Sequence, residues 1–551
     1  MQALLSPLTE LADYQEIVKN RGKEEGFIQI AGCVNSQKTH LMYALCDGWE
    51  YRVIAFSGEE KAKKAFEEYR FLNENVCLYP ARDFLFYYAD IKGKLLTSRR
   101  MEVLRALIEK DEGEELTVIT TIDAFLDGLP APEAVRQQKI RLVNGQTVDY
   151  ADLQTRLAGM GYERESLVEG PGQFAVRGGI LDIYPLTEEM PVRIELWGDE
   201  IDSIRSFDVE SQRSVENLEE IEIYPASENW TEEMETVSFL DYFPVKKTLL
   251  FLDEPIRLKE KADDVEEEYV HSRQNREEAG MNPGGGALTV YPVREIIEKM
   301  NRYSGIACTT LESKCGEFHI SRTYSIQTKS VNPYNNSFEL LTRDLKRLKR
   351  SGSRVVLLSG SRTRARRLAE DLRDYDLSSF YSEDMERCVN PGEIMVSYGY
   401  AAEGYEYPML KFVVISETDI FGRKKKKKRR RRYDGQKIQD FTELRPGDYV
   451  VHENHGVGVY QGIEKVEVDK VVKDYLKISY AEGGVLYIPV AQMDLIQKYS
   501  GADGRKPKLN KLGTAQWGKT KSQVKKAVQA VAKDLVELYA VRQQSEGFVY
   551  G

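Results

Sequence analysis

The sequence predicts a multidomain α/β protein in which two regions are built mainly from strands. The chain has 551 residues, which is enough for about three to five domains of ordinary size. Near the N-terminus, apolar strand-like runs at 27–30, 52–56 and 116–120 alternate with helical segments, and this order is typical of a parallel sheet. Short strands separated by turns dominate residues 138–221 and 444–495, which predicts antiparallel structure in both regions.

Two further segments have a clear pattern. Residues 354–358 and 411–416 are apolar strand-like runs that flank a helix predicted at 363–372, so they form another βα unit. In the tail, apolar residues recur at steps of four and three through 520–539. This spacing predicts a helix with a single apolar stripe, which must dock on another surface.

Charge is distributed unevenly along the chain. The sequence has 78 cations and 89 acidic residues, for a net charge of −11. Ten consecutive cations occupy residues 423–432, so the rest of the chain is markedly acidic. Because like charges repel, we expect this run to be a solvated linker, with contact to the DNA backbone as a second role. The candidate DNA contacts are Arg423, Lys424, Lys425, Arg430 and Arg432.

Composition argues against several classes of protein. No stretch approaches the roughly 18 consecutive apolar residues of a membrane helix, and the N-terminus lacks the basic leader of a signal peptide. The six cysteines show no C-x-x-C spacing, so we expect reduced thiols. His452 and His455 lie close in sequence without further ligands nearby, and we expect no metal site. These features indicate a cytoplasmic protein without a membrane partner.

A turn after the first predicted strand resembles a phosphate-binding loop. It reads Gly32-Cys-Val-Asn-Ser-Gln37-Lys38-Thr39, and the P-loop pattern G-x-x-x-x-G-K-[ST] is matched everywhere except at Gln37. Backbone N–H groups must curl around a phosphate there, so a side chain at this position crowds the ligand. We interpret the turn as a nucleotide site that has lost its function, and a chance match in an ordinary βα turn stays open.

A partial second half of such a site is present in the run Leu249-Leu-Phe-Leu-Asp253-Glu254. ATPases present a carboxylate pair to Mg²⁺ and water at the end of an apolar strand, although an acidic residue at a strand end is equally common. We therefore expect a scaffold with no catalytic residues and no bound cofactor. The predicted vestigial site comprises Gly32, Gln37, Lys38, Thr39, Asp253 and Glu254.

Ordered blocks of sequence identify a resemblance to a family of DNA repair proteins. Residues 172–185 and 193–208 resemble the UvrA-binding module that is shared by UvrB and the bacterial transcription-repair coupling factors. Residues 416–425 and 445–462 favour the coupling factors, because they look like the end of the third domain and the start of the RNA-polymerase-interacting domain of that family. Residues 512–517 look like the lead-in to the motor of the same family.

The resemblance implies a fold for each part of the chain. A UvrB-like, degenerate RecA-like module is interrupted by an antiparallel α/β domain, and a small α/β domain and a Tudor/SH3-like barrel follow. Full-length members continue into an ATP-driven DNA translocase, and no intact P-loop appears after residue 500, so we expect an N-terminal portion in which ATP and Mg²⁺ have no role. The expected segments are 1–137, 138–221, 222–340, 341–421, a basic linker at 422–440, the barrel at 441–505 and a linker helix at 506–551.

Strand alternation predicts which side chains form the UvrA-facing surface. In the run 192–197, Arg193 and Trp197 share the face opposite to Ile194. An exposed Arg beside an exposed Trp is typical of a protein-binding hot spot. The resemblance implies that Arg177, Arg193 and Trp197 contact UvrA. A Trp that lies on a neighbouring helix, with Arg as a surface charge, is the alternative.

The polymerase-facing surface is predicted on the strand at 474–480, which we interpret as an edge strand. An edge strand can recruit a partner strand through its backbone. The resemblance implies that Leu476 contacts the β subunit of RNA polymerase, and we assign Tyr475 and Lys477 to the same surface. Because the strand alternates, either of its faces could be the core.

Three functional hypotheses follow. The leading one is an adaptor that binds stalled RNA polymerase and recruits UvrA for nucleotide excision repair of the transcribed strand, with double-stranded DNA bound weakly if at all. The runner-up is an enzyme, an active UvrB-like ATPase or damage-verification protein that uses Lys38 and Asp253. The third is a nucleic-acid-binding protein driven by the basic run. Robust DNA-stimulated ATP hydrolysis would favour the enzyme.

Overall fold

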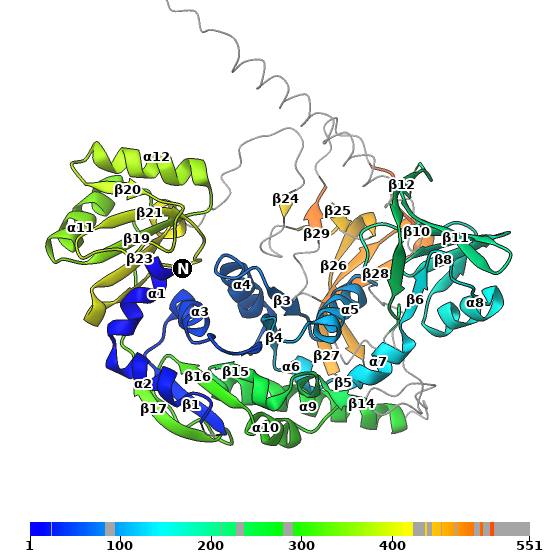
Figure 1. The fold of residues 1–551 in the computed structure, drawn as a ribbon, viewed down its shortest axis with the longest axis horizontal. Coiled ribbons are helices and arrows are strands. Elements are labelled where there is room, and N and C mark those ends of the chain that lie inside the picture. The colour runs from blue at the N-terminus through cyan, green and yellow to red at the C-terminus, as the bar shows by residue number, and fades with distance from the viewer. Residues whose placement is uncertain are drawn as a thin grey trace, which may run out of the picture. The chain divides into compact units, whose positions relative to one another are not determined.

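Figure 1 shows the chain as a computed structural model. Contacts define two compact units, one made of residues 1–138 and 228–427 and the other of residues 139–227 and 428–551. The basic run at 423–432, the block at 512–517 and the helix predicted at 520–539 lie outside the described residues. The structure describes residues 1–23, 25–82, 94–209, 211–227, 236–278, 290–422, 436–437, 444–452, 455–468, 471–489, 496–499 and 507–511.

The first unit is organised around a parallel sheet of seven strands. The strand order is β17-β1-β16-β15-β2-β4-β3, and every neighbouring pair runs parallel. The central strands are apolar and buried on both faces, as expected for a parallel sheet covered by helices. The prediction of a parallel sheet is therefore confirmed. Its strands are β1 (Gly26–Ala31), β2 (Tyr51–Phe56), β3 (Val76–Tyr79), β4 (Leu116–Thr121), β15 (Thr248–Asp253), β16 (Ser304–Thr309) and β17 (Ile320–Ser325).

Helices connect and cover these strands, and their sequences explain how they form. The first turn of α4 carries Glu59 and Glu60, whose charges suit the positive end of the helix dipole. Helix α10 buries apolar side chains at helical spacing from Val293 to Met300. In the described part of the chain, no helix is both long and apolar enough to cross a membrane. The helices are α1 (Gln2–Leu5), α2 (Ala12–Asn20), α3 (Asn35–Ala44), α4 (Glu59–Tyr69), α5 (Lys94–Glu109), α6 (Asp123–Leu126), α7 (Pro132–Gln138), α9 (Pro255–Glu278) and α10 (Val293–Met300).

Small elements complete this part of the unit. Strands β5 (Gly128–Pro130) and β14 (Thr236–Ser238) pair antiparallel and lie on either side of the second unit in the sequence. Short 3₁₀ turns also occur in the described residues of this part. They are η1 (Ser6–Glu10), η2 (Phe239–Tyr242) and η3 (Val245–Lys247).

A second sheet of six strands lies in the same unit. Its order is β18-β22-β23-β19-β21-β20, in which β23, β19, β21 and β20 run parallel. Its elements are β18 (Lys329–Ser330), α11 (Phe338–Arg350), β19 (Arg354–Ser359), α12 (Arg362–Arg373), β20 (Ser379–Tyr381), β21 (Ile394–Tyr398), β22 (Tyr405–Tyr407), η4 (Pro408–Leu410), β23 (Phe412–Ser416) and α13 (Glu417–Phe421).

The two faces of this second sheet have different partners (Figure 1). Helices α11 and α12 cover one face, where their leucines pack on Val355, Leu357 and Ile415. The other face contributes Val356 and other apolar residues to a core that also contains residues of α1, α3 and the first sheet. Helix α3 is consequently buried on nearly all sides and has almost no amphipathic character.

The second unit contains a sheet with the order β12-β11-β10-β9-β8-β7. Neighbouring strands run antiparallel except for β7 and β8, and this confirms the antiparallel region predicted at 138–221. Helix α8 and a two-stranded ribbon of β6 and β13 share its core. The elements are β6 (Ile140–Val143), α8 (Tyr150–Gly159), β7 (Glu163–Glu165), β8 (Gln173–Arg177), β9 (Ile180–Tyr184), β10 (Val192–Trp197), β11 (Glu200–Phe207), β12 (Ser214–Leu218) and β13 (Glu220–Ile223).

The C-terminal strands form a six-stranded antiparallel sheet with the order β24-β29-β25-β26-β27-β28. Strand β27 lies between β26 and β28, so the prediction that residues 474–480 form an edge strand is wrong. The hairpin partner 485–489 occupies that edge instead. The elements are β24 (Gln436–Lys437), β25 (Tyr449–His452), β26 (Gly456–Val468), β27 (Val471–Ser479), η6 (Ala481–Gly483), β28 (Val485–Pro489) and β29 (Ile496–Lys498).

Helix α11 offers a matched test of the second core. Leu345 is fully buried, whereas Leu340 on the same helix is 42% exposed. Leu345→Ala should destabilise the second sheet by about 2–5 kcal/mol through lost burial and a residual cavity, while Leu340→Ala should change stability by less than about 0.5 kcal/mol. Hydrogen exchange measured on peptides from 338–421 reports this local stability. Equal exchange in the two variants would contradict the packing described.

Candidate functional site

The turn between β1 and α3 has backbone N–H groups that are already bonded within the protein. The Cys33 N–H donates to the Thr309 carbonyl over 3.1 Å, and the Val34 N–H donates to the side-chain oxygen of Gln37 over 3.2 Å. Gly32 adopts a φ of +88°, a conformation that favours glycine. N–H groups at this place are the ones that cradle a phosphate in a P-loop, and two of them are already occupied by acceptors within the protein.

Gln37 fills the position where a P-loop has its second glycine. Its side chain is fully buried, and its Nε2 donates to the hydroxyl of Tyr407 in β22 over 3.0 Å. The same hydroxyl lies 3.0 Å from Nδ1 of His40, whose Nε2 lies 3.1 Å from the Leu4 carbonyl. Burial lowers the pKa of His40 to about 4, so this ring is neutral near pH 7. Gln37 therefore links the turn to the second sheet.

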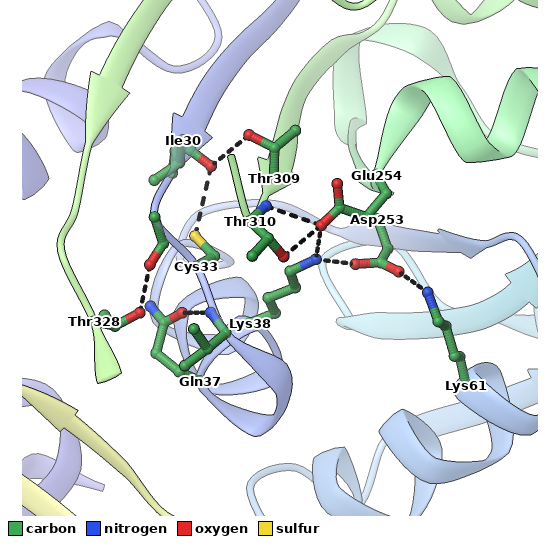
Figure 2. Close-up of polar contacts among 12 residues, drawn as sticks. Ile30, Cys33, Gln37, Lys38, Lys61, Asp253, Glu254, Thr309, Thr310 and Thr328 are labelled. Carbon is green, nitrogen blue, oxygen red and sulfur yellow. Dashed lines mark hydrogen bonds and ion pairs between the residues drawn. The ribbon is translucent and has the colours of Figure 1, made fainter. Parts of the chain in front are cut away.

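Lys38 is held by both predicted carboxylates. Its Nζ lies 2.6 Å from Oδ1 of Asp253 and 2.7 Å from Oε1 of Glu254, as Figure 2 shows. Asp253 has a second cation, Lys61, at 3.4 Å, and Glu254 also accepts from the N–H and hydroxyl of Thr310 at 2.9 and 2.7 Å. The lysine that binds phosphates in a P-loop is thus neutralised within this protein.

The protonation of this cluster follows from its contacts. Burial opposes the charge of Lys38, but the attraction of Asp253 and Glu254 outweighs it and raises the lysine pKa. Burial likewise disfavours the Glu254 carboxylate, but bonds from Lys38 and Thr310 hold its pKa below the usual value. Both groups are therefore charged near pH 7.

Thr39 is engaged by an acidic residue that sequence reasoning missed. Its hydroxyl donates to Oε2 of Glu68 over 2.8 Å, and the other carboxylate oxygen accepts from the Ser36 hydroxyl and from the Ala402 N–H. Glu68 is 4% exposed. A signal for it was present, because Ala62, Ala65 and Glu68 recur at helical spacing along the buried face of α4. A charge in that stripe needs an internal partner.

Of the six predicted residues of the vestigial site, the structure brings Lys38, Asp253 and Glu254 into direct contact. The others bond elsewhere: Thr39 to Glu68, Gln37 to Tyr407, and the Gly32 carbonyl to the Thr328 hydroxyl. In the described part of the chain, no group of three or more His, Cys, Asp or Glu side chains is placed to hold a metal ion.

The three residues predicted to contact UvrA differ in how far their side chains are exposed. Arg193 is bidentate to Asp182, with Nε 2.7 Å from Oδ1 and Nη2 2.9 Å from Oδ2, and Arg177 pairs with the same carboxylate. Only 14% of the Arg193 side chain is exposed, compared with 45% for Arg177. The expectation of an exposed Arg193 is therefore wrong, because Asp182 and the Phe207 ring cover its guanidinium.

Trp197 ends β10 and is 85% exposed, which agrees with its expected place on the surface. Asp182 was missed by sequence reasoning, although it is fully buried and stands between apolar residues of β9. Its register opposite Arg193 on β10 brings the two charges together. A lone Asp in an apolar strand was the available signal.

The polymerase-facing prediction needs a correction. Leu476 is fully buried in the core of the C-terminal sheet and Tyr475 is 1% exposed, so neither side chain is available to a partner surface. Lys477 is one-third exposed and pairs with Glu464 at 2.7 Å. The predicted DNA contacts Arg423, Lys424, Lys425, Arg430 and Arg432 lie outside the described residues.

Comparison with known proteins identifies two domains in the second unit. The model of the UvrB interaction domain matches residues 140–229, and that of the CarD-like/TRCF RID domain matches residues 444–500. The chain thus carries, in one polypeptide, a repair-protein interaction domain and a domain of the transcription-repair coupling type.

Relatives extend this similarity to nearly the whole chain. The chain is 30% identical to the transcription-repair-coupling factor of Bacillus subtilis (strain 168) over 613 residues, which cover 98% of this chain and 51% of the relative. Transcription-repair-coupling factors of Staphylococcus haemolyticus and Staphylococcus aureus (strain MRSA252) are also 30% identical, over 87% of this chain and 45% of each relative. Over nearly its whole length the chain is similar to the transcription-repair-coupling factors, as the sequence blocks predicted, and it spans about half the length of the curated relatives it matches.

The contacts of Asp253 offer a matched pair of lysines. Lys38→Met leaves two carboxylates, one of them deeply buried, without their main cation, and should lower the free energy of unfolding by about 3–5 kcal/mol. Lys61→Met removes a cation that is 46% exposed and should cost less than about 1 kcal/mol. Thermal and urea unfolding of the first unit would measure both, and equal losses would contradict the geometry.

The ion pair between Lys38 and Glu254 predicts a pH dependence of stability. The pKa of Glu254 is lowered in the folded state, so its contribution to stability is present above the unfolded pKa and disappears as pH falls through the folded pKa. The penalty of Lys38→Met should therefore shrink as the medium is acidified, because burial makes the unpaired Glu254 carboxylate take up a proton more readily than the paired one. A penalty that stays constant from pH 7 to pH 3.5 in urea unfolding would contradict this.

Proposed function

We propose that the chain is the adaptor part of a transcription-repair-coupling factor. It binds the β subunit of stalled RNA polymerase and recruits UvrA, which starts nucleotide excision repair of the transcribed strand. The observation that carries the proposal is the presence of a UvrB interaction domain at 140–229 and a CarD-like/TRCF RID domain at 444–500 in one chain. We propose a cytoplasmic location, as this function requires.

The adaptor role is preferred to a UvrB-like ATPase because the side chains of Lys38 and Thr39, which would serve a nucleotide, already bond within the protein. Lys38 is bonded to Asp253 and Glu254, and a fully buried Gln37 stands in place of the glycine. We propose that this part needs no cofactor, and that ATP and Mg²⁺ serve a translocase motor in the longer protein that displaces stalled polymerase. Measured ATP turnover should be indistinguishable from background, and robust DNA-stimulated hydrolysis would overturn the adaptor role.

We propose that UvrA binds through Trp197 and Arg177, with Arg193 as a supporting contact. Trp197 supplies a large apolar anchor, and the half-exposed guanidinium of Arg177 is positioned by the buried Asp182. Arg193 holds the same carboxylate from the neighbouring strand.

Trp197→Ala should weaken UvrA binding by more than about 30-fold, which corresponds to about 2 kcal/mol or more at a hot spot. Val215→Ala is the matched control, because Val215 is an apolar side chain on the same sheet that is 59% exposed. Interferometry with purified UvrA would measure both dissociation constants. Wild-type affinity in the Trp197 variant would remove this surface from the proposal.

For the polymerase, we propose that Lys477 makes the contact while Leu476 and Tyr475 support it from the core. Lys477→Glu should weaken binding to a β-subunit fragment by about tenfold without changing the melting temperature, since this side chain is partly exposed. Leu476→Arg should melt the C-terminal sheet, because it places a charge in a packed core. Lys508→Glu, at an exposed cation of the same unit, is the control. A folded Leu476→Arg variant that loses binding would contradict the assignment.

A further inference from the structure

A surface on the second sheet is used by neither proposed partner. It lies at the carboxyl edge of the parallel strands, where α12 follows β19 and where β21 ends. Ligands of open α/β sheets bind at this edge. We name it the arginine–tyrosine patch, and it consists of Arg362, Arg364, Arg366, Arg367, Tyr398 and Tyr400.

The arginines are concentrated where they do not help the helix to form. The first two turns of α12 contain four of them and its first turn contains no acidic residue, so their charges oppose the positive end of the helix dipole. Helix α11, which packs on the same sheet, has charges that suit its dipole, with Glu339 in its first turn and cations in its last. Local folding therefore does not explain the arginines of α12.

These side chains are also exposed. Arg362, Arg364 and Arg366 are 66%, 51% and 63% exposed, and Arg367 is exposed beside them. Such side chains keep their donors accessible even where a carboxylate contacts them, because a guanidinium has five N–H groups.

Planar rings alternate with the guanidinium groups. The Arg362 guanidinium lies 4.9 Å from the ring centre of Tyr398, and the Arg366 guanidinium lies 5.1 Å from that of Tyr381. The centre of the Phe71 ring lies 5.5 and 5.7 Å from the ring centres of Tyr398 and Tyr400. Both tyrosines remain 36% exposed. Cations interleaved with accessible aromatic rings are the pattern that binds single nucleic-acid strands.

Two carboxylates face the patch and do not cancel it. Glu383 pairs with Arg362 and Arg366, while Glu417 pairs with Arg364. Glu417 also accepts from the Gly360 N–H over 3.0 Å and the Ser359 hydroxyl over 2.8 Å, so a carboxylate already fills the N-terminal end of α12. Four arginines against two acids leave the patch positive in a chain whose net charge is −11.

We propose that the arginine–tyrosine patch binds a single nucleic-acid strand, with guanidinium groups on the phosphates and the rings of Tyr398 and Tyr400 against the bases. An acidic polypeptide would use the charges but would have no planar groups to stack on these rings. The inference does not depend on the proposed adaptor function, because the site is separate from both partner domains.

The test must separate this patch from the basic run at 423–432. Nucleic-acid binding is therefore measured in the full chain and in a variant whose ten consecutive cations are replaced by serine and glycine. Fluorescence anisotropy with a labelled 20-nucleotide DNA strand, the matching RNA and the matching duplex gives the affinity at several salt concentrations. UvrA and polymerase are absent, so failure of the adaptor proposal would leave this measurement intact.

Arg362→Gln, Arg366→Gln and Arg367→Gln together should weaken strand binding about tenfold in the variant without the basic run, and should reduce the salt slope by about two. Tyr398→Leu with Tyr400→Leu should weaken binding about fivefold or more while leaving the salt slope unchanged. The matched control removes three cations from α11 through Arg343→Gln, Lys346→Gln and Arg350→Gln, and should change affinity less than twofold.

Cross-linking locates the strand directly. A strand that contains bromodeoxyuridine, irradiated on the full chain, should label peptides that include Tyr398 or Tyr400. Equal losses in the patch and control triples, labelling confined to other peptides, or equally tight binding of poly-glutamate would each overturn the proposal. Preference for the strand over the duplex supports it, and preference for the duplex overturns it.

Discussion

Helix α3 lies between two sheets, and the rest of the first unit follows from that constraint. Residues 36–40 of this helix are buried, so each polar side chain among them needs an internal partner. Gln37 reaches Tyr407, Lys38 reaches Asp253 and Thr39 reaches Glu68. A nucleotide would have to displace these bonds, and the one from Gln37 to Tyr407 joins the helix to the second sheet. The side chain that stands in place of the P-loop glycine thus also helps to dock that sheet.

Buried carboxylates organise both units in the same manner. Asp253, Glu68 and Asp182 each accept from at least two donors that come from separate elements. Asp419 does this over a shorter range, since one of its oxygens accepts from the Ser416 and Gly404 N–H groups. Removing a donor leaves a buried charge, and that is costly in a low-dielectric interior. These acids therefore tie together elements that lie apart in the sequence.

Features that depend on local pattern could be predicted from the sequence. The parallel sheet follows from alternating strands and helices, and the antiparallel sheet follows from strands joined by short turns. Long-range pairing could not be predicted in this way. Residues 474–480 alternate cleanly, but nothing in them shows that 485–489 would cover their edge, or that Leu476 would face the core.

In the candidate sites too, local features could be predicted from the sequence and long-range contacts could not. The missing glycine was visible at Gln37, but its bond to Tyr407 joins residues far apart in the sequence and matches no motif. Arg193 and Trp197 share a strand face as alternation requires, yet only Trp197 is exposed, because the partner of Arg193 comes from the neighbouring strand. Alternation along a strand predicts the face to which a side chain points, whereas its exposure depends on the residues of the neighbouring strand.

Strand β1 has consequences for how the chain is made. Both of its neighbours, β16 and β17, come from residues 304–325. At a synthesis rate of about 5–20 residues per second, β1 waits roughly 15–60 s for its first partner to leave the ribosome. The strands of residues 139–227 pair within a short span and can close during that interval. An apolar first strand left unpaired for so long is a natural client for ribosome-associated chaperones, and slower translation would lengthen its exposure.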